Sequence, residues 1–268
     1  MMTRRFFAIS LPAVVARRKL RAETNESRGH KLVDKLVEGL GGDVFLNMHD
    51  RTEVGEAYSF AVRQISGKSI VHIYTQYREQ SGPSDFPALR EREAFLKNQD
   101  DAIIFAEGTA YEVNFRGARP VADDTLHRFI ETTNRNVFYV IRQRLHEKGM
   151  YFESPGGDLV DNQAVEVLNI TDPQNRKVTA YLHHLTSLPV MQKTRIMDPV
   201  LKEQREETTR FSNYRRVAPG IMWPWAIFRE RDGEKVFQMF SSNVTVNNDL
   251  PDKLFRLPPG VKMLKKES

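Results

Sequence analysis

The second half of this chain consists almost entirely of short strands separated by tight turns, and this pattern limits the fold more than any other feature. The turns carry Asp, Asn, Gly and Pro, as at 171–175 and 231–234. Strands that follow one another through such turns pair antiparallel. An antiparallel meander is therefore expected, with strands at 164–170, 178–184, 190–197, 207–217, 221–229 and 235–246.

The first half is predicted to repeat this arrangement after one helix. Leu32, Leu36 and Leu40 recur at helical spacing, and Gly41 and Gly42 end that pattern. Period-two alternation then predicts a hairpin with its turn at 65–68, followed by strands at 88–97, 101–106 and 110–115. A strongly twisted sheet of about ten strands must curl, split or be covered.

A second helix is expected between the two runs of strands. Asp123 or Asp124 is predicted to cap its start, and 146–149 to end it. Its broad apolar face consists of Leu126, Phe129, Ile130, Val137, Phe138, Val140, Ile141 and Leu145. The expected fold class is therefore α+β and mainly β: a curved antiparallel sheet covered by helices on its concave side. Residues 23–268 contain no repeat or linker and are expected to form a single domain.

Residues 1–22 are predicted to be an export signal of the twin-arginine kind. Arg4 and Arg5 precede an apolar run of about ten residues, too short to span a membrane. The basic residues of this leader account for the whole net charge of +5. The rest of the chain is close to neutral, which argues against nucleic-acid binding. The predicted location is the periplasm, and the alternative is an uncleaved basic start on a cytoplasmic protein.

Motifs for catalysis and metal binding are lacking in the sequence. The chain has no cysteine, which excludes disulfides and thiolate chemistry. His183 and His184 are adjacent on an expected strand and point to opposite faces, so they cannot share one metal ion. Ser241 and Ser242 lie outside any G-x-S-x-G elbow. We therefore expect no enzymatic activity, no metal and no cofactor.

The C-terminal part of the chain resembles a known family. In order, it reads VEVLNIT, KVTAYLHHLTSLPVMQKTR, FSNYRRVAPGIMWPWAIF and FQMFSSNVTVNNDLPDKLFRLPPG. Residues 163–255 thus resemble the LolA/LolB-like outer-membrane lipoprotein carrier superfamily, in particular the outer membrane lipoprotein-sorting proteins. The resemblance implies an incomplete β-barrel closed by helices, with an apolar cavity that shields acyl chains. No motif in this chain marks the positive residue that such carriers hold near the cavity.

This resemblance implies a periplasmic, non-enzymatic carrier or binding protein. Its partners would be lipoprotein or lipid acyl chains and an envelope protein that donates or accepts the cargo, and not nucleic acid. Two alternatives remain open: a sensor or scaffold that binds another protein, and a hydrolase with a dispersed site. The residues expected to line the cavity are Tyr58, Phe60, Tyr74, Phe129, Val137, Phe138, Ile141 and Trp223. The same residues could be plain core packing, because periodicity gives the direction of a side chain and not the space beyond it.

The C-terminal tail is expected to protect the sheet. Residues 242–246 continue the last strand, and prolines then stiffen an apolar segment. An incomplete barrel has an open edge that invites pairing with another chain. We expect Leu250, Leu254 and Phe255 to fold back over that edge.

Overall fold

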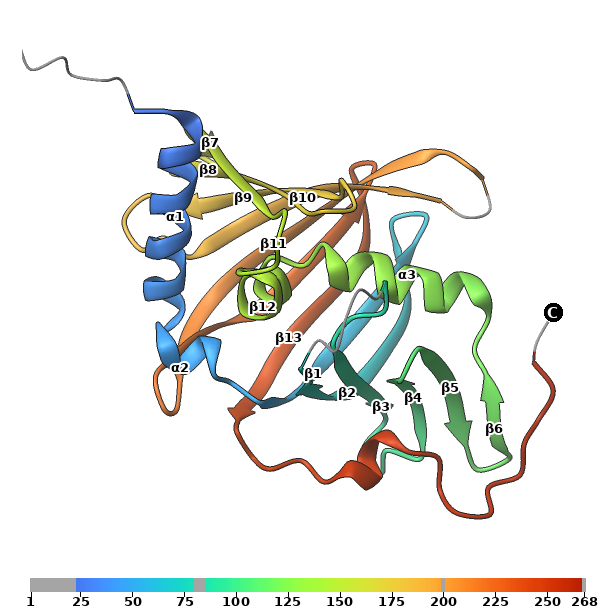
Figure 1. Cartoon of the computed structure of the whole chain (residues 1–268). Coiled ribbons are helices and arrows are strands. Elements are labelled where there is room, and N and C mark those ends of the chain that lie inside the picture. Colours follow the sequence, from blue (N-terminus) through green and yellow to red (C-terminus); the bar gives the residue numbers. More distant parts are fainter. Residues whose placement is uncertain (1–22, 80–84, 199–200, 267–268) are drawn as a thin grey trace, which may run out of the picture.

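The computed structural model describes residues 23–79, 85–198 and 201–266 (Figure 1). The predicted export signal at 1–22 lies outside the described residues. The helical elements that the structure describes are α1 (Asn25–Leu40), α2 (Asp43–Leu46), α3 (Asp123–Asn134), α4 (Val137–Tyr139), the π-helical turn η1 (Val140–Arg144) and the 3-10 turn η2 (Asp252–Phe255).

The strands of the described residues form one antiparallel sheet built from two meanders. The first meander contains β1 (Asp50–Ala61), β2 (Gln64–Tyr77), β3 (Leu89–Phe95), β4 (Asp101–Ala106), β5 (Thr109–Asn114) and β6 (Gly117–Pro120). The second contains β7 (Tyr151–Val160), β8 (Gln163–Thr171), β9 (Lys177–His183), β10 (Pro189–Met197), β11 (Gln204–Val217), β12 (Ile221–Arg231) and β13 (Glu234–Val246).

Pairing between β1 and β13 joins the two meanders into a 13-stranded sheet, with β6 and β7 as its two edges. The sheet is not closed, and helices pack on one of its faces, which we call the inner face. The predicted fold class, a curved antiparallel sheet with covering helices, is confirmed.

The structure corrects the prediction for two strands and one turn. The prediction omitted β6 and β7, and in β7 the Pro155-Gly156-Gly157 stretch suggests a turn. The strand instead continues through it with a shift of register between Glu153 and Gly156. The predicted turn at 65–68 was wrong: β1 and β2 join at Val62 and Arg63, whose φ angles of 49° and 64° suit a tight hairpin.

The expected helices are partly confirmed. Helix α1 ends as predicted, at Gly41, whose φ of 124° favours glycine. The second helix was predicted as one piece, but it breaks after α3. The cause is Asn136, whose side chain accepts hydrogen bonds from the amides of Phe138 and Tyr139 and so caps a new helix. The residue at the N-cap position of α3 is Ala122, not Asp123 or Asp124.

The helices divide the inner face between them. In Figure 1, α3 crosses the first meander, and α1 stands beside β7 and β8. The main hydrophobic core lies between the second meander and the helices α1 and α4. It includes Leu36 of α1, Phe138 of α4 and Phe211 of β11. A smaller core under α3 stacks Phe129 on Phe105, with ring centres 3.8 Å apart.

Both edges of the sheet are covered. At β7, Arg28 of α1 donates hydrogen bonds to the carbonyl of Ser154, at 3.2 and 3.1 Å. Gly29 allows this approach, because a Cβ there would lie 2.6 Å from the backbone of Glu153. At β6, the tail contributes an isolated parallel bridge between Ala118 and Met263.

The tail covers the β6 edge further along the chain than predicted. The amide of Ala118 donates to the carbonyl of Lys262 at 2.9 Å, and the amide of Leu264 donates to the carbonyl of Ala118 at 2.8 Å. Phe255 is 2% exposed and lies before this contact, in the turn η2 beside β3 and β4. The expectation that a tail covers an edge is therefore correct, whereas the residues expected to make the contact are not.

Candidate functional site

A cavity of about 380 Å³ lies between the inner face of the sheet and the junction of α3 with α4. Its apolar walls include Val71, Phe95, Phe237, Met239 and Ile227. Charged side chains also line it, from β1, β3 and β12. The cavity is therefore an amphipathic space and not a purely apolar one.

The charged groups follow the register of the strands. Arg51 of β1, Thr75 of β2 and Glu91 of β3 lie opposite one another across the sheet. Arg51 donates to the hydroxyl of Thr75 at 3.2 Å, and that hydroxyl donates to Glu91 at 2.8 Å. Glu53, Ile73 and Glu93 form the neighbouring row. We call Arg51, Glu53, Thr75, Glu91 and Glu93 the polar belt.

Glu53 and Arg51 form the deep part of the polar belt. The side chain of Glu53 is 2% exposed and accepts hydrogen bonds from the indole of Trp223, at 3.3 Å, and from the hydroxyl of Ser241. Arg51 lies 3.5 Å from Glu53 and stacks on the Trp223 ring at 4.3 Å. Burial opposes the charge of Arg51, but Tyr77, Glu53 and Glu91 raise its pKa above the usual value. Arg51 is therefore a charged residue that its own neighbours already neutralise.

Glu91 and Glu93 are inward neighbours on β3 with raised pKa values. Burial raises the pKa of Glu91, against the opposing effect of Arg51 and the hydrogen bond from Thr75. Burial, with the neighbouring Glu91, raises the pKa of Glu93 from 4.5 to about 7, although Arg229 lowers it. Within the described residues, no hydrogen bond or ion pair reaches the carboxylate of Glu93. A carboxyl group that titrates near neutral pH in a cavity is typical of functional sites.

Two of the eight residues predicted from the sequence line this cavity. Phe138 of α4 and Trp223 of β12 belong to its wall. Val137 and Ile141 are fully buried in the main core, and Phe129 is buried in the smaller core under α3. These three occupy the core-packing positions that the sequence left open as an alternative.

Tyr58, Phe60 and Tyr74 lie on the outer face of the sheet, away from the cavity. Their sequence neighbours Ala57 and Ile73 line it, and adjacent residues of a strand point to opposite faces. Both alternating sets of residues on β1 and β2 contain apolar side chains, so hydropathy alone cannot select the inward set. The expected position of these three residues in the lining is corrected here, and ligand binding by the predicted residues stays a prediction.

The sequence prediction missed the polar belt and Arg229. The polar belt leaves only a weak pattern in the sequence, because β3 reads Leu-Arg-Glu-Arg-Glu-Ala-Phe and carries charge on both faces. One usable sign is that Glu91 and Glu93 are two residues apart, as are Arg51 and Glu53, so each pair shares a face. Which face is inward depends on the curvature of the whole sheet.

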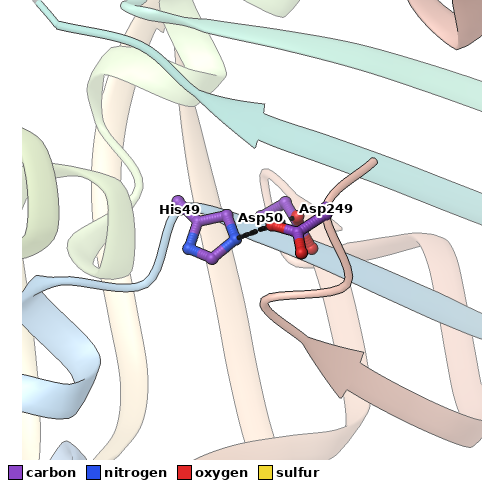
Figure 2. Close-up of side chains that lie close together, drawn as sticks. All are labelled: His49, Asp50 and Asp249. Atoms are coloured by element: carbon purple, nitrogen blue, oxygen red, sulfur yellow. Dashed lines mark hydrogen bonds and ion pairs between the residues drawn. The ribbon is translucent and has the colours of Figure 1, made fainter. Parts of the chain in front are cut away.

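A second group of titratable residues lies at the start of β1. Figure 2 shows His49 facing Asp50 and Asp249, with its Nε2 atom 3.5 Å and 3.2 Å from their carboxylates. One imidazole and two carboxylates are possible ligands of a divalent cation. Asp50 is 1% exposed, however, and its two oxygens accept the amides of Asn248 and Leu250 at 2.8 and 3.1 Å. The group is therefore best described as the anchor of the C-terminal tail.

Two other hollows lack the features of the cavity. One of about 440 Å³ lies beside β7 to β11, where Arg210 pairs with Asp161 at 2.7 Å. The other, of about 540 Å³, lies beside α2 and η1. Neither is placed between the covering helices and both meanders, so the cavity at the polar belt is the candidate site. None of the helices in the described part of the chain combines the length and hydropathy of a membrane-spanning segment.

Comparison with solved structures places this architecture among known folds. A putative outer membrane lipoprotein-sorting protein domain from Vibrio parahaemolyticus matches with a TM-score of 0.56 and 11% identity, over 87% of this chain and 97% of that one. A DUF1329 family protein from Desulfovibrio piger matches with a TM-score of 0.56 and 13% identity, over 85% and 97%.

A LolA superfamily protein from Nitrosomonas europaea matches with a TM-score of 0.52 and 14% identity, over 85% of this chain and 97% of that one. No family model matches the sequence, and no curated protein matches it. At these identities the likeness concerns the fold alone. The incomplete antiparallel barrel, its covering helices and these three structures together establish that the chain has the LolA-like fold.

Proposed function

We propose that this protein is a periplasmic, non-enzymatic carrier or binding protein that shields acyl chains in the cavity beneath α3 and α4. The observation that carries the proposal is this cavity of about 380 Å³, enclosed between helices and an incomplete barrel. Its apolar walls can exclude water from a hydrocarbon chain. Each methylene group removed from water contributes about 0.8 kcal/mol, so a short chain is enough for useful affinity.

Binding of an acyl chain depends on a cavity of suitable shape that excludes water, more than on specific hydrogen bonds or catalytic groups. Val71 and Phe95 form one side of the apolar wall, and Phe237 and Met239 form another. A chain lying between them would replace contacts with water by contacts with side chains. The LolA superfamily and lipoprotein-sorting names of the structural neighbours support a cargo that bears acyl chains.

Release requires the cavity to open, and α3 is the element that can move. Arg128 of α3 pairs with Glu207 of β11 at 3.9 Å, and Asn134 donates to the carbonyl of Asp85 at 2.7 Å. Lys266 also pairs with Asp123 at the start of α3, at 2.5 Å, and the side chains of Asp123 and Lys266 are exposed. The proposal includes export through the leader at 1–22 and an envelope protein that donates or accepts the cargo, because a shielded chain needs a partner to reach its destination.

The experiment compares substitutions of two neighbouring residues on β2 whose side chains point to opposite faces of the sheet. Val71 is 4% exposed and lines the cavity, whereas Ile70 is 40% exposed and lies on the outer face. Delipidated protein is titrated with a fluorescent acyl probe, and circular dichroism confirms the fold of each variant. Val71→Phe should lower affinity at least about tenfold by filling the space, and Ile70→Phe should leave it unchanged. Absence of saturable binding to folded wild type would contradict the proposal.

Hydrolysis is the second candidate function, and the polar belt is the observation that favours it. Glu91 and Glu93 are paired carboxylates, and a pKa of about 7 at Glu93 suits a general acid or base. The cavity wall carries hydroxyl groups on Thr75, Tyr77, Thr132, Thr133 and Tyr139, and its described residues include no histidine. A hydrolase would release product from ester or glycoside substrates in proportion to enzyme and lose this activity in Glu93→Gln. A carrier would bind its ligand without turnover.

A further inference from the structure

The cavity carries an excess of negative charge at one side of its wall. Among the described residues, Arg51 and Arg229 are the basic residues of its lining, against the three carboxylates of Glu53, Glu91 and Glu93. One carboxylate is therefore without a matching cation. This imbalance is a property of an enclosed space, where water screens charges less than it does at the surface.

Arg51 already has acidic neighbours, although its Nε–H group makes no hydrogen bond in the described residues. It lies 3.5 Å from Glu53, donates to Thr75, and covers the ring of Trp223. Thr75 in turn donates to Glu91, so a row of hydrogen bonds links Arg51 to Glu91. An anionic group arriving at this point would meet Glu53 and Glu91 as well as Arg51.

Arg229 lies on β12, at the opposite wall of the cavity. Its guanidinium covers the ring of Phe237 at 5.3 Å. Arg229 is an exposed residue, whereas Glu93 is partly buried within the cavity. Its charge lowers the pKa of Glu93, yet no ion pair joins the two in the described residues. Glu93 therefore remains as a carboxylate that faces open space without a partner.

Resting on the carrier function proposed above, we propose that the bound amphiphile has a positively charged amine in its head group, held against Glu93 and Glu91. The two carboxylates lie two residues apart on one face of β3, so one ammonium group can donate to both. The apolar chain then lies along Val71, Phe95 and Met239. Phe95 adds an aromatic face, which attracts cations.

The ligand class follows from what the site would reject. A phosphate or carboxylate head group would place a second negative charge beside Glu93, in a space with little screening. A neutral head group with hydroxyl groups can donate hydrogen bonds to Glu93, but it leaves the negative charge of this carboxylate unbalanced. An amine satisfies the carboxylate and corrects the charge balance of the wall.

The test uses three amphiphiles with the same alkyl length: dodecylamine, dodecanoate and glycerol monododecanoate. Each is titrated calorimetrically below its micelle concentration, at a pH above the pKa of Glu93 and below that of the amine. The amine should bind at least about tenfold more tightly than either of the others. Glu93→Gln should remove most of this preference and leave the affinity for the neutral compound unchanged.

The control variant is Glu234→Gln, which makes the same change of charge at an exposed position outside the cavity and should keep the preference. The outcomes separate the two proposals. Saturable binding without preference for the amine, or a preference that survives Glu93→Gln, overturns the head-group inference and leaves the carrier function intact. No saturable binding of any of the three to folded protein overturns the carrier function, and the head-group inference with it.

Discussion

The two meanders bury charged residues in opposite ways. Under the second meander, Asp172 is 5% exposed and accepts hydrogen bonds from Arg144 at 2.8 Å and Arg176 at 2.6 Å. Burial alone would raise its pKa, but the hydrogen bonds from the two arginines hold the pKa of Asp172 below its usual value. On the first meander, burial raises the pKa of Glu93, which has no partner in the described residues.

This difference distinguishes a structural region from a functional one. The charges around Asp172 are matched, because Glu147 also pairs with Arg144 at 2.6 Å and gives two carboxylates for two arginines. Arg144 also borders the hollow beside α2 and η1. The polar belt faces a cavity, and the described lining of that cavity has three carboxylates against two arginines when Arg229 is counted with the belt. A protein that keeps an unpaired, partly buried carboxylate accepts a loss of stability there, and such losses are typical of sites that bind a ligand.

The largest expected effect comes from breaking the matched cluster. Asp172→Asn leaves Arg176 buried without its carboxylate and leaves Arg144 with Glu147 alone, so the free energy of unfolding should fall by about 3–5 kcal/mol near neutral pH. Urea unfolding measures this change. Asp161→Asn is the control, because its side chain is 72% exposed and its pair with Arg210 should contribute less than about 1 kcal/mol.

The lowered pKa of Asp172 also sets a pH window. The stabilisation is fully present above the unfolded pKa of 3.8 and is lost as pH falls through the lower folded value. Wild-type protein should therefore lose this contribution only in strong acid, and Asp172→Asn should show a smaller loss there. An equal acid loss in both proteins would mean that the cluster around Asp172 is not matched in the way described.

Glu93→Gln should change the free energy of unfolding in the opposite direction from Asp172→Asn. Between 4.5 and about 7, folded protein retains a proton on Glu93 that unfolded protein has released, so the free energy of unfolding falls as pH rises through this window. Above it, the cost reaches up to about 3 kcal/mol. The variant should therefore be more stable than wild type at alkaline pH and equal to it in acid.

Urea unfolding at both ends of this pH window measures the effect of Glu93→Gln. Glu234→Gln, whose side chain is 62% exposed, should follow the wild-type curve. If Glu93→Gln is destabilising at alkaline pH, then Glu93 has a partner like that of Asp172, and the contrast between the meanders fails.

Helix α1 and most strands of the second meander were easier to predict from the sequence than the cavity at the polar belt. Helix α1 and the strands of the second meander follow directly from period 3.6 and period two, because one face of each is apolar. Two local features defeated this approach: the Pro155-Gly156-Gly157 stretch inside β7, and the cap at Asn136 that breaks the second helix. Both are decided by hydrogen bonds that hydropathy does not report.

The cavity could be predicted only in part, for a physical reason. Phe138 and Trp223 line it, as their apolar character suggests. Glu91 and Glu93 are charged, and a charged residue on a strand is expected to face water. Arg229 approaches them only because the sheet curves until β12 stands across from β3. Sequence distance and period contain no information on that curvature.

The smallest expected effect concerns the ion pair that holds α3 over the cavity. The Arg128–Glu207 pair spans 3.9 Å with the arginine 42% exposed, and Glu207 keeps a second partner, Arg231, at 3.1 Å. Arg128→Ala should therefore lower the free energy of unfolding by less than about 1 kcal/mol. If α3 opens as a unit, the same small energy raises the release rate of a bound acyl probe by up to about fivefold, because affinity changes act mainly through dissociation. Arg63→Ala removes an exposed pair with Glu234, and because neither residue lines the cavity this variant should leave release unchanged. Stopped-flow displacement decides the point: equal release rates in both variants would place the exit elsewhere and leave α3 as a fixed part of the wall.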